Sequence, residues 1–181
     1  MPFTFPDGLA PEAYPLAWLV GHWRGEGVIS YPDIPETTFV QDVVFDHDGG
    51  PYLRYEATTR LPAVEPGADG PDGEETVWST ETGYWRVSPE PHEGAREDQA
   101  SLEVLLADPA GRVSVYLGVA GNGRIDLVSD LIARTSTGAD VTASKRMYGL
   151  VEGSLMWAWD LAAFGKPLQS YASAQLFRQE A

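Results

Sequence analysis

The chain has 181 residues, with 27 acidic and 12 basic side chains and a formal net charge of -15 at pH 7. This charge repels phosphate backbones and argues against nucleic acid as a partner, and the absence of cysteine excludes disulfides and thiolate metal sites. Hydrophobic residues make up 43% of the chain, which suits one folded domain over residues 1–181. Since no apolar run approaches a membrane span, we expect no membrane partner and a soluble, cytoplasmic protein, either a monomer or a homodimer.

The predicted elements begin with a short helix or turn over residues 11–20, which Pro11 and Pro15 keep short. After it, runs rich in β-branched and aromatic residues alternate with turn signals such as Gly121-Asn122-Gly123. The predicted strands cover residues 22–31, 37–46, 51–61, 76–87, 101–107, 112–119, 124–134, 140–149, 154–161 and 168–178. Short strands at this spacing predict an all-β sandwich or barrel.

Two acidic segments rich in glycine and proline interrupt the strands. They lie near residues 62–75 and 88–100 and are predicted to be long loops that join neighbouring strands. His92 belongs to the second loop and is expected in solvent.

The first strand contains the run Gly21-His22-Trp23-Arg24-Gly25-Glu26-Gly27. Glycine inside a strand marks a bend, a bulge or a close approach of another backbone. A bent first strand that carries one buried tryptophan is what a small closed barrel needs at its start.

The last two predicted strands show alternating faces. In residues 154–161, Trp157 and Trp159 share one face, which we interpret as core rather than as the lining of a lumen. In residues 168–178, strict alternation places Tyr171 on a mixed face with Ser173, Gln175 and Phe177. The opposite face is small and apolar, with Ala172, Ala174 and Leu176.

Several motifs in order resemble those of the nitrobindins. Gly21, Trp23, Gly25 and Gly27 match the family's Gly-x-Trp-x-Gly-x-Gly signature, and the segment Glu81-Thr82-Gly83-Tyr84-Trp85-Arg86 matches its Glu-x-Gly-Tyr-x-Arg pattern. The resemblance runs from about residue 15 to residue 178. It implies a ten-stranded antiparallel up-and-down β-barrel, similar to lipocalins and fatty-acid-binding proteins, that holds haem in an apolar pocket.

The resemblance also implies a changed site. Nitrobindins hold the haem iron with a histidine of the last strand, in a pattern like Pro-Leu-x-x-His, and Tyr171 stands at that position here. A neutral imidazole binds iron at physiological pH, whereas a tyrosine must first lose a proton whose ordinary pKa is about 10. Tyr171 is therefore either an axial ligand helped by a cation such as Lys145 or Arg146, or a core or lumen residue with a hydrogen-bonded hydroxyl. His22 either faces the haem side of the lumen or lies opposite Trp23 with an ordinary hydrogen bond.

Three functions remain open from the sequence. The first is a barrel that binds a small hydrophobic molecule without iron, with Tyr171 and His22 as polar contacts and no cofactor. The alternative is a protein that binds haem b through Tyr171 and acts on peroxynitrite or nitric oxide, as a peroxynitrite isomerase does. The third is a structural or interaction role with the lumen filled by side chains. We predict no catalytic residue and no metal site, because the three histidines form no short-spaced pair.

Overall fold

The chain forms a closed antiparallel β-barrel in a computed structural model, which describes residues 4–63 and 74–180. The strands are β1 (Gly21–Tyr31), β2 (Ile34–Asp46), β3 (Leu53–Leu61), β4 (Thr76–Val87), β5 (Ala100–Asp108), β6 (Arg112–Gly121), β7 (Arg124–Arg134), β8 (Val141–Val151), β9 (Ser154–Ala163) and β10 (Gln169–Arg178).

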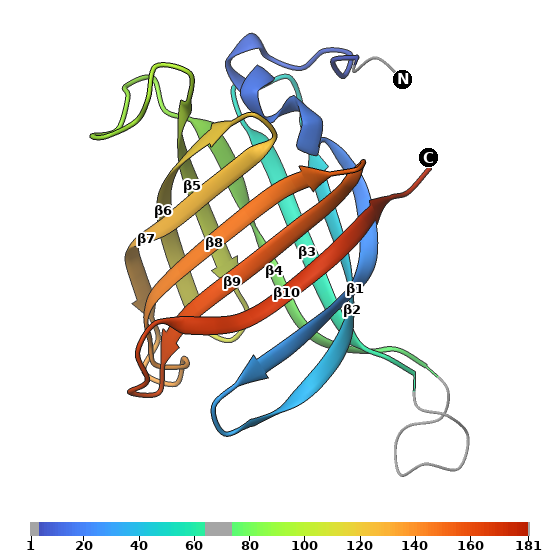
Figure 1. Ribbon diagram of the computed structural model, residues 1–181, viewed down its shortest axis with the longest axis vertical. Coiled ribbons are helices and arrows are strands. Elements are labelled where there is room, and N and C mark those ends of the chain that lie inside the picture. Colours follow the sequence, from blue (N-terminus) through green and yellow to red (C-terminus); the bar gives the residue numbers. More distant parts are fainter. Residues whose placement is uncertain (1–3, 64–73, 181) are drawn as a thin grey trace.

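Each strand pairs with the next strand in the sequence, and β1 closes the barrel by pairing with β10 (Figure 1). The expected ten-stranded antiparallel up-and-down barrel is therefore confirmed. Some strand ends differ from the prediction. For example, β2 begins at Ile34 because Asp33 adopts a φ of 67° in a tight turn, which lets Tyr31 pair with Ile34.

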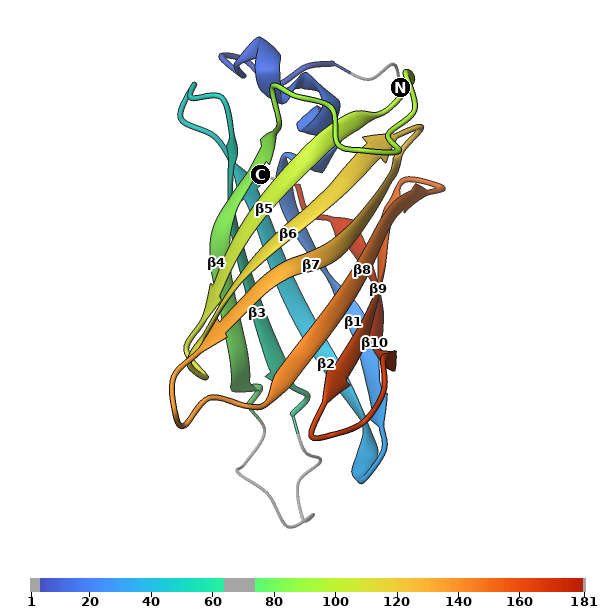
Figure 2. The same cartoon turned by 90° about the vertical axis from the view of Figure 1, so that its left-hand side faces the viewer.

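The short helix predicted near the N-terminus is a 3₁₀ helix, η1 (Pro11–Leu19), which lies across one end of the barrel (Figures 1 and 2). Leu16 and Leu19 on this helix are fully buried, and the indole N–H of Trp23 donates to the Leu19 carbonyl at 2.7 Å. No helix in residues 4–63 or 74–180 is long and apolar enough to cross a membrane.

Arg178 of β10 fastens η1 to the barrel. Its guanidinium lies 4.2 Å from the centre of the Trp23 ring and donates to the main-chain carbonyls of Trp18 and Val20. Gly21 has a φ of 136°, and a Cβ there would lie 2.4 Å from the Arg178 Nη1 atom. The first signature glycine therefore leaves room for this clamp.

The other signature glycines allow close approach between strands. A Cβ on Gly25 would lie 2.1 Å from the Gln175 carbonyl oxygen, and a Cβ on Gly27 would lie 2.2 Å from the ring of Phe39. Of the roles expected for these glycines, close approach is the one observed, because β10 and the Phe39 ring occupy the space that side chains would need.

The most densely buried part of the core lies next to η1. Trp23, Phe45, Leu53, Trp85 and Leu102 each expose 1% or less of their surface, and they come from β1 to β5. Since this end is filled by side chains, a ligand cavity must lie toward the opposite end of the barrel.

Of the two predicted loops, only the second lies entirely within the described residues. Residues 64–73, which make up most of the first, lie outside the described residues. Residues 88–99 connect β4 to β5 without a helix or strand. His92 is partly buried rather than in solvent, because its ring Nε2 lies 2.9 Å from the Leu102 carbonyl oxygen and its main-chain N–H donates to Ser101 at 2.8 Å.

Candidate functional site

A cavity of about 460 Å³ opens inside the barrel, away from the η1 end. Its volume lies within the range of about 300–1,000 Å³ that is usual for small-molecule sites. Much of its wall is aromatic, and the Phe39 and Trp157 rings stack with centres 6.0 Å apart. The main aromatic lining residues are Phe39, Tyr55, Tyr148, Trp157, Trp159 and Tyr171.

A β-bulge brings Tyr171 into this cavity. Ser170 pairs with Asp160 of β9 and Ala172 pairs with Trp159, so Tyr171 is an extra residue without a partner in that ladder. Tyr171 and Ala172 consequently both line the cavity. The sequence had placed Tyr171 on the same face as Ser173, and this assignment is wrong, because Ser173 is exposed on the outside of the barrel.

The surroundings of Tyr171 keep its phenol neutral. Its ring contacts Tyr31 and Trp159 edge to face, with centres 5.7 Å and 5.0 Å apart. Burial raises the pKa of Tyr171 above its ordinary value of 10.0, although the charges of Arg112 and Arg146 act in the opposite direction. Within residues 4–63 and 74–180, no hydrogen bond reaches its hydroxyl, which borders the open cavity.

The strongest charge pair of the cavity joins β8 to β4. Arg146 donates from Nη1 to Glu81 Oε1 at 2.6 Å and from Nη2 to Oε2 at 2.7 Å. The exposed fraction is only 6% for the Arg146 side chain and 16% for that of Glu81. The Tyr55 hydroxyl also donates to Glu81 Oε1, at 3.2 Å. Burial lowers the pKa of Arg146, but the charge and hydrogen bond of Glu81, together with the neighbouring Tyr116 and Tyr148, outweigh it, so the pKa lies well above its ordinary value and the guanidinium stays charged.

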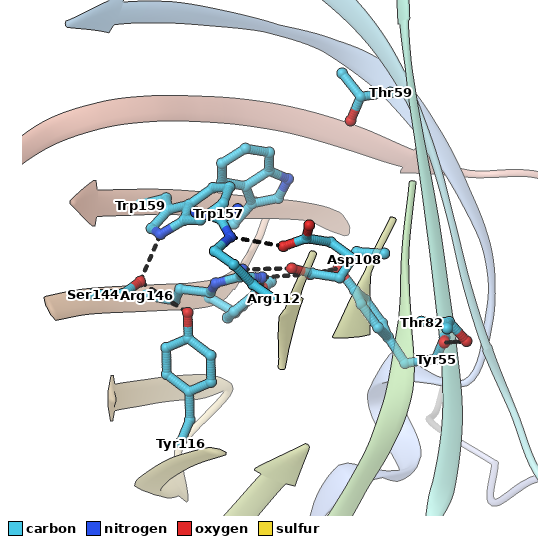
Figure 3. Close-up of polar contacts among 12 residues, drawn as sticks. Tyr55, Thr59, Thr82, Asp108, Arg112, Tyr116, Ser144, Arg146, Trp157 and Trp159 are labelled. Atoms are coloured by element: carbon cyan, nitrogen blue, oxygen red, sulfur yellow. Dashed lines mark hydrogen bonds and ion pairs between the residues drawn. The ribbon is translucent and has the colours of Figure 1, made fainter. Parts of the chain in front are cut away.

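Aromatic rings hold the Arg146 guanidinium from two sides. Its central carbon lies 4.1 Å from the centre of the Trp159 ring and 5.1 Å from that of Tyr116. Ser144 links these rings, because the Trp159 indole and the Tyr116 hydroxyl donate to its Oγ at 2.6 Å and 2.8 Å (Figure 3). Arg146 therefore has a fixed position in the wall of the cavity.

A second arginine–carboxylate pair lies where β5 turns into β6. Arg112 donates from Nε to Asp108 Oδ2 at 2.9 Å, and both residues line the cavity (Figure 3). Farther along the wall, Gln41 accepts from the Trp157 indole at 2.9 Å and donates to Thr59 at 3.1 Å. The polar groups of the cavity are thus largely paired with one another.

The structure places His22 outside the barrel, so its expected position at the lumen needs correction. Its Nε2 lies 2.7 Å from Asp42 Oδ1, and 46% of its side chain is exposed. The alternative stated above, opposite Trp23 with an ordinary hydrogen bond, describes the observed position. Because Trp23 points into the core, the preceding residue must point outward.

Of the two cations suggested as partners for Tyr171, only Arg146 faces the lumen. Lys145 is exposed, since neighbouring residues of β8 point to opposite sides of the wall. Trp157 and Trp159 also differ from the interpretation as core, because both are half-buried and line the cavity.

The sequence did not predict that Glu81 lies in the lumen, and it gave Arg112 no role in the site. The signal for Arg146 was its place in the alternation Ser144, Arg146, Tyr148, which is the buried face of β8. Glu81 gave no such signal, because its partner lies 65 residues away in the sequence.

The fold and the site define an up-and-down β-barrel with a cavity of largely aromatic lining in its lumen. The family described as "THAP4-like, heme-binding beta-barrel domain" matches residues 12–178. The chain belongs to this family and is a nitrobindin-like protein.

Individual relatives support this assignment. The chain is 49% identical to the "Ferric nitrobindin-like protein" of Beutenbergia cavernae, with 98% of this chain and 99% of the relative covered. It is 37% identical to the "Peroxynitrite isomerase" of Nocardioides sp., over 99% of this chain and 100% of the relative. The crystal structure of Rv2717c from M. tuberculosis is similar with a TM-score of 0.75 and 32% identity, covering 95% of this chain and 99% of the other.

Proposed function

We propose that the barrel binds a small, largely apolar molecule in its lumen without a haem iron. The observation that carries the proposal is Tyr171, the residue at the position where the resemblance to nitrobindins implies the iron-binding histidine. Its phenol is held neutral by burial, and a neutral phenol is a poor iron ligand.

The rest of the cavity supports the same proposal. A tyrosinate ligand needs a free cation nearby, but Arg112 is paired with Asp108 and Arg146 with Glu81. Among the described residues, no histidine, cysteine or methionine lines the cavity. These residues do not fit the ligation of a haem iron, whereas aromatic walls with a few polar groups are typical of sites for apolar ligands.

A haem titration tests the iron part of the proposal. We expect the purified protein to show no Soret band after hemin is added, and the Tyr171→His variant to gain one, since an imidazole would then stand at the bulge. Stoichiometric, tight haem binding by the wild-type protein that is lost in Tyr171→Phe would overturn the proposal and favour haem ligation by tyrosine, with chemistry on peroxynitrite or nitric oxide.

A pair of neighbouring residues tests the lumen part. Ala172 lines the cavity, whereas Ser173 is exposed on the outer face of the same strand. We expect Ala172→Phe to abolish binding of an apolar fluorescent probe that quenches Trp157 and Trp159, and Ser173→Phe to leave it unchanged. Native mass spectrometry of the purified protein would show whether a molecule is retained. Equal binding by both variants would place the probe outside the lumen.

A further inference from the structure

Both cations that line the cavity already hold a carboxylate of the chain itself. Arg146 is bound by Glu81 through two hydrogen bonds of 2.6 and 2.7 Å, and Arg112 is bound by Asp108 at 2.9 Å. Among residues 4–63 and 74–180, the lumen therefore contains charged groups but offers no free positive charge to a ligand.

The Glu81 carboxylate occupies the fork that a ligand carboxylate would need. Two parallel N–H to oxygen bonds are the preferred way for a guanidinium to bind a carboxylate. Both Nη atoms of Arg146 are used in this way, and its Nε is buried without a hydrogen-bond partner in the described part of the chain. The rings of Trp159 and Tyr116 contact the same guanidinium, so turning toward a second anion would cost these contacts as well.

Building on the proposed lumen-binding function, we propose that Glu81 determines the class of ligand. Glu81 acts as an internal carboxylate, so that the lumen accepts neutral aromatic molecules and rejects carboxylic acids in their ionised form. A ligand carboxylate would have to displace Glu81 from a buried ion pair or lie beside it as a like charge, and both are costly in a site of low polarity.

A neutral aromatic ligand meets no such obstacle. Trp157, Trp159 and Tyr171 present half-buried rings to the cavity, which favour contact with a flat apolar molecule. The Tyr171 hydroxyl is available to hydrogen-bond one polar atom of such a molecule. The chemistry expected of the ligand is therefore an aromatic ring system with an uncharged hydrogen-bonding group.

The test compares two probes of nearly the same shape, 2-naphthamide and 2-naphthoate, by isothermal titration calorimetry and by the shift in thermal midpoint. At pH 7 only the second carries a charge. We expect the wild-type protein to bind the amide at least about ten-fold more tightly than the carboxylate. In Glu81→Gln the preference reverses, because a neutral amide no longer balances the charge of Arg146 and the naphthoate carboxylate can displace it.

Controls separate this role of Glu81 from general effects of charge and stability. Glu103 forms an ion pair with Arg86 on the outside of the barrel, with 3.1 Å between Arg86 Nε and Glu103 Oε2, and serves as the control for Glu81. Glu103→Gln should keep the wild-type preference for the amide. If Glu81→Gln is poorly folded, naphthoate should raise its thermal midpoint more than the amide does, since a ligand that binds only the folded state stabilises it.

The outcomes distinguish the two proposals. The role of Glu81 is overturned if the wild-type protein binds naphthoate as tightly as the amide, or if Glu81→Gln gains neither affinity nor thermal stability with naphthoate. If neither probe binds the wild-type protein, the proposed lumen-binding function fails for aromatic ligands, and the inference built on it fails as well.

Discussion

Removing the positive charge of Arg146 should be far more damaging than removing both charges of its pair. Arg146→Met leaves the Glu81 carboxylate, of which 16% is exposed, without its partner. Breaking a buried ion pair in this way costs about 3–5 kcal/mol of the free energy of unfolding. The lost stacking of the guanidinium on Trp159 and Tyr116 is part of the damage, at about 0.5–2 kcal/mol.

The double variant Arg146→Met with Glu81→Gln separates these contributions. It removes the unpaired charge and should recover about 2 kcal/mol or more relative to Arg146→Met alone. The measurement is urea unfolding followed by tryptophan fluorescence, with the four proteins of the cycle compared at pH 7. Arg86→Met, which breaks the exposed pair with Glu103 on the outer surface, is the control and should cost less than about 1 kcal/mol. Additive costs for the two single substitutions would refute the reasoning, since the two side chains would then not be energetically coupled.

The fold and the outer surface support three further predictions. In urea unfolding, Gly25→Ala should lower the free energy of unfolding by about 1–3 kcal/mol, because its Cβ would lie 2.1 Å from the Gln175 carbonyl oxygen. Gly149→Ala is the control and should have little effect, because its Cβ would meet no atom closer than 3.9 Å. Trp23→Phe should cost about 1–3 kcal/mol, because the buried Leu19 carbonyl loses its hydrogen bond, and a wild-type urea midpoint would contradict this. Burial raises the pKa of Asp42, but the hydrogen bond from His22 and the neighbouring guanidiniums outweigh it, so the pKa lies below the ordinary 3.8. The stabilisation from Asp42 is therefore complete above about pH 4 and is lost as the pH falls through its folded pKa. The difference in urea midpoint between wild type and Asp42→Asn should shrink between pH 6 and pH 3. A difference that stays constant over this range would contradict the prediction.

The strands could be predicted because their signals are local. Glycine and proline mark the turns, and the alternation of side chains along each strand follows from backbone geometry alone. The strand over residues 124–134 was predicted with the bounds that the structure has. The motif glycines also identified the first strand correctly, although the reason for each glycine, such as the Arg178 clamp beside Gly21, depends on the partner strand.

The lumen could be predicted only in part, because its contacts join distant parts of the chain. Glu81 and Arg146 lie 65 positions apart, and neither strand has a local sequence pattern that predicts a contact with the other. The sequence singled out Tyr171 through the family pattern, and this residue lines the cavity, but alternation assigned it to the wrong face because a bulge changes the count by one. A bulge depends on how two strands pair, so a single strand does not reveal it.

At the bulge, the choice of side chain that faces the lumen is independent of strand pairing, whereas at ordinary positions of a barrel wall the two are linked. Ordinary wall positions must fit a neighbour on each side, so that a new side chain there disturbs the pairing of the sheet. Tyr171 has no counterpart on β9, and the alternation from Ala172 onward continues regardless of it. This cavity-lining position can therefore exchange a phenol for an imidazole, or the reverse, while the barrel around it keeps its shape. In such a fold, selection can alter the chemistry of the interior by single substitutions without first rebuilding the scaffold.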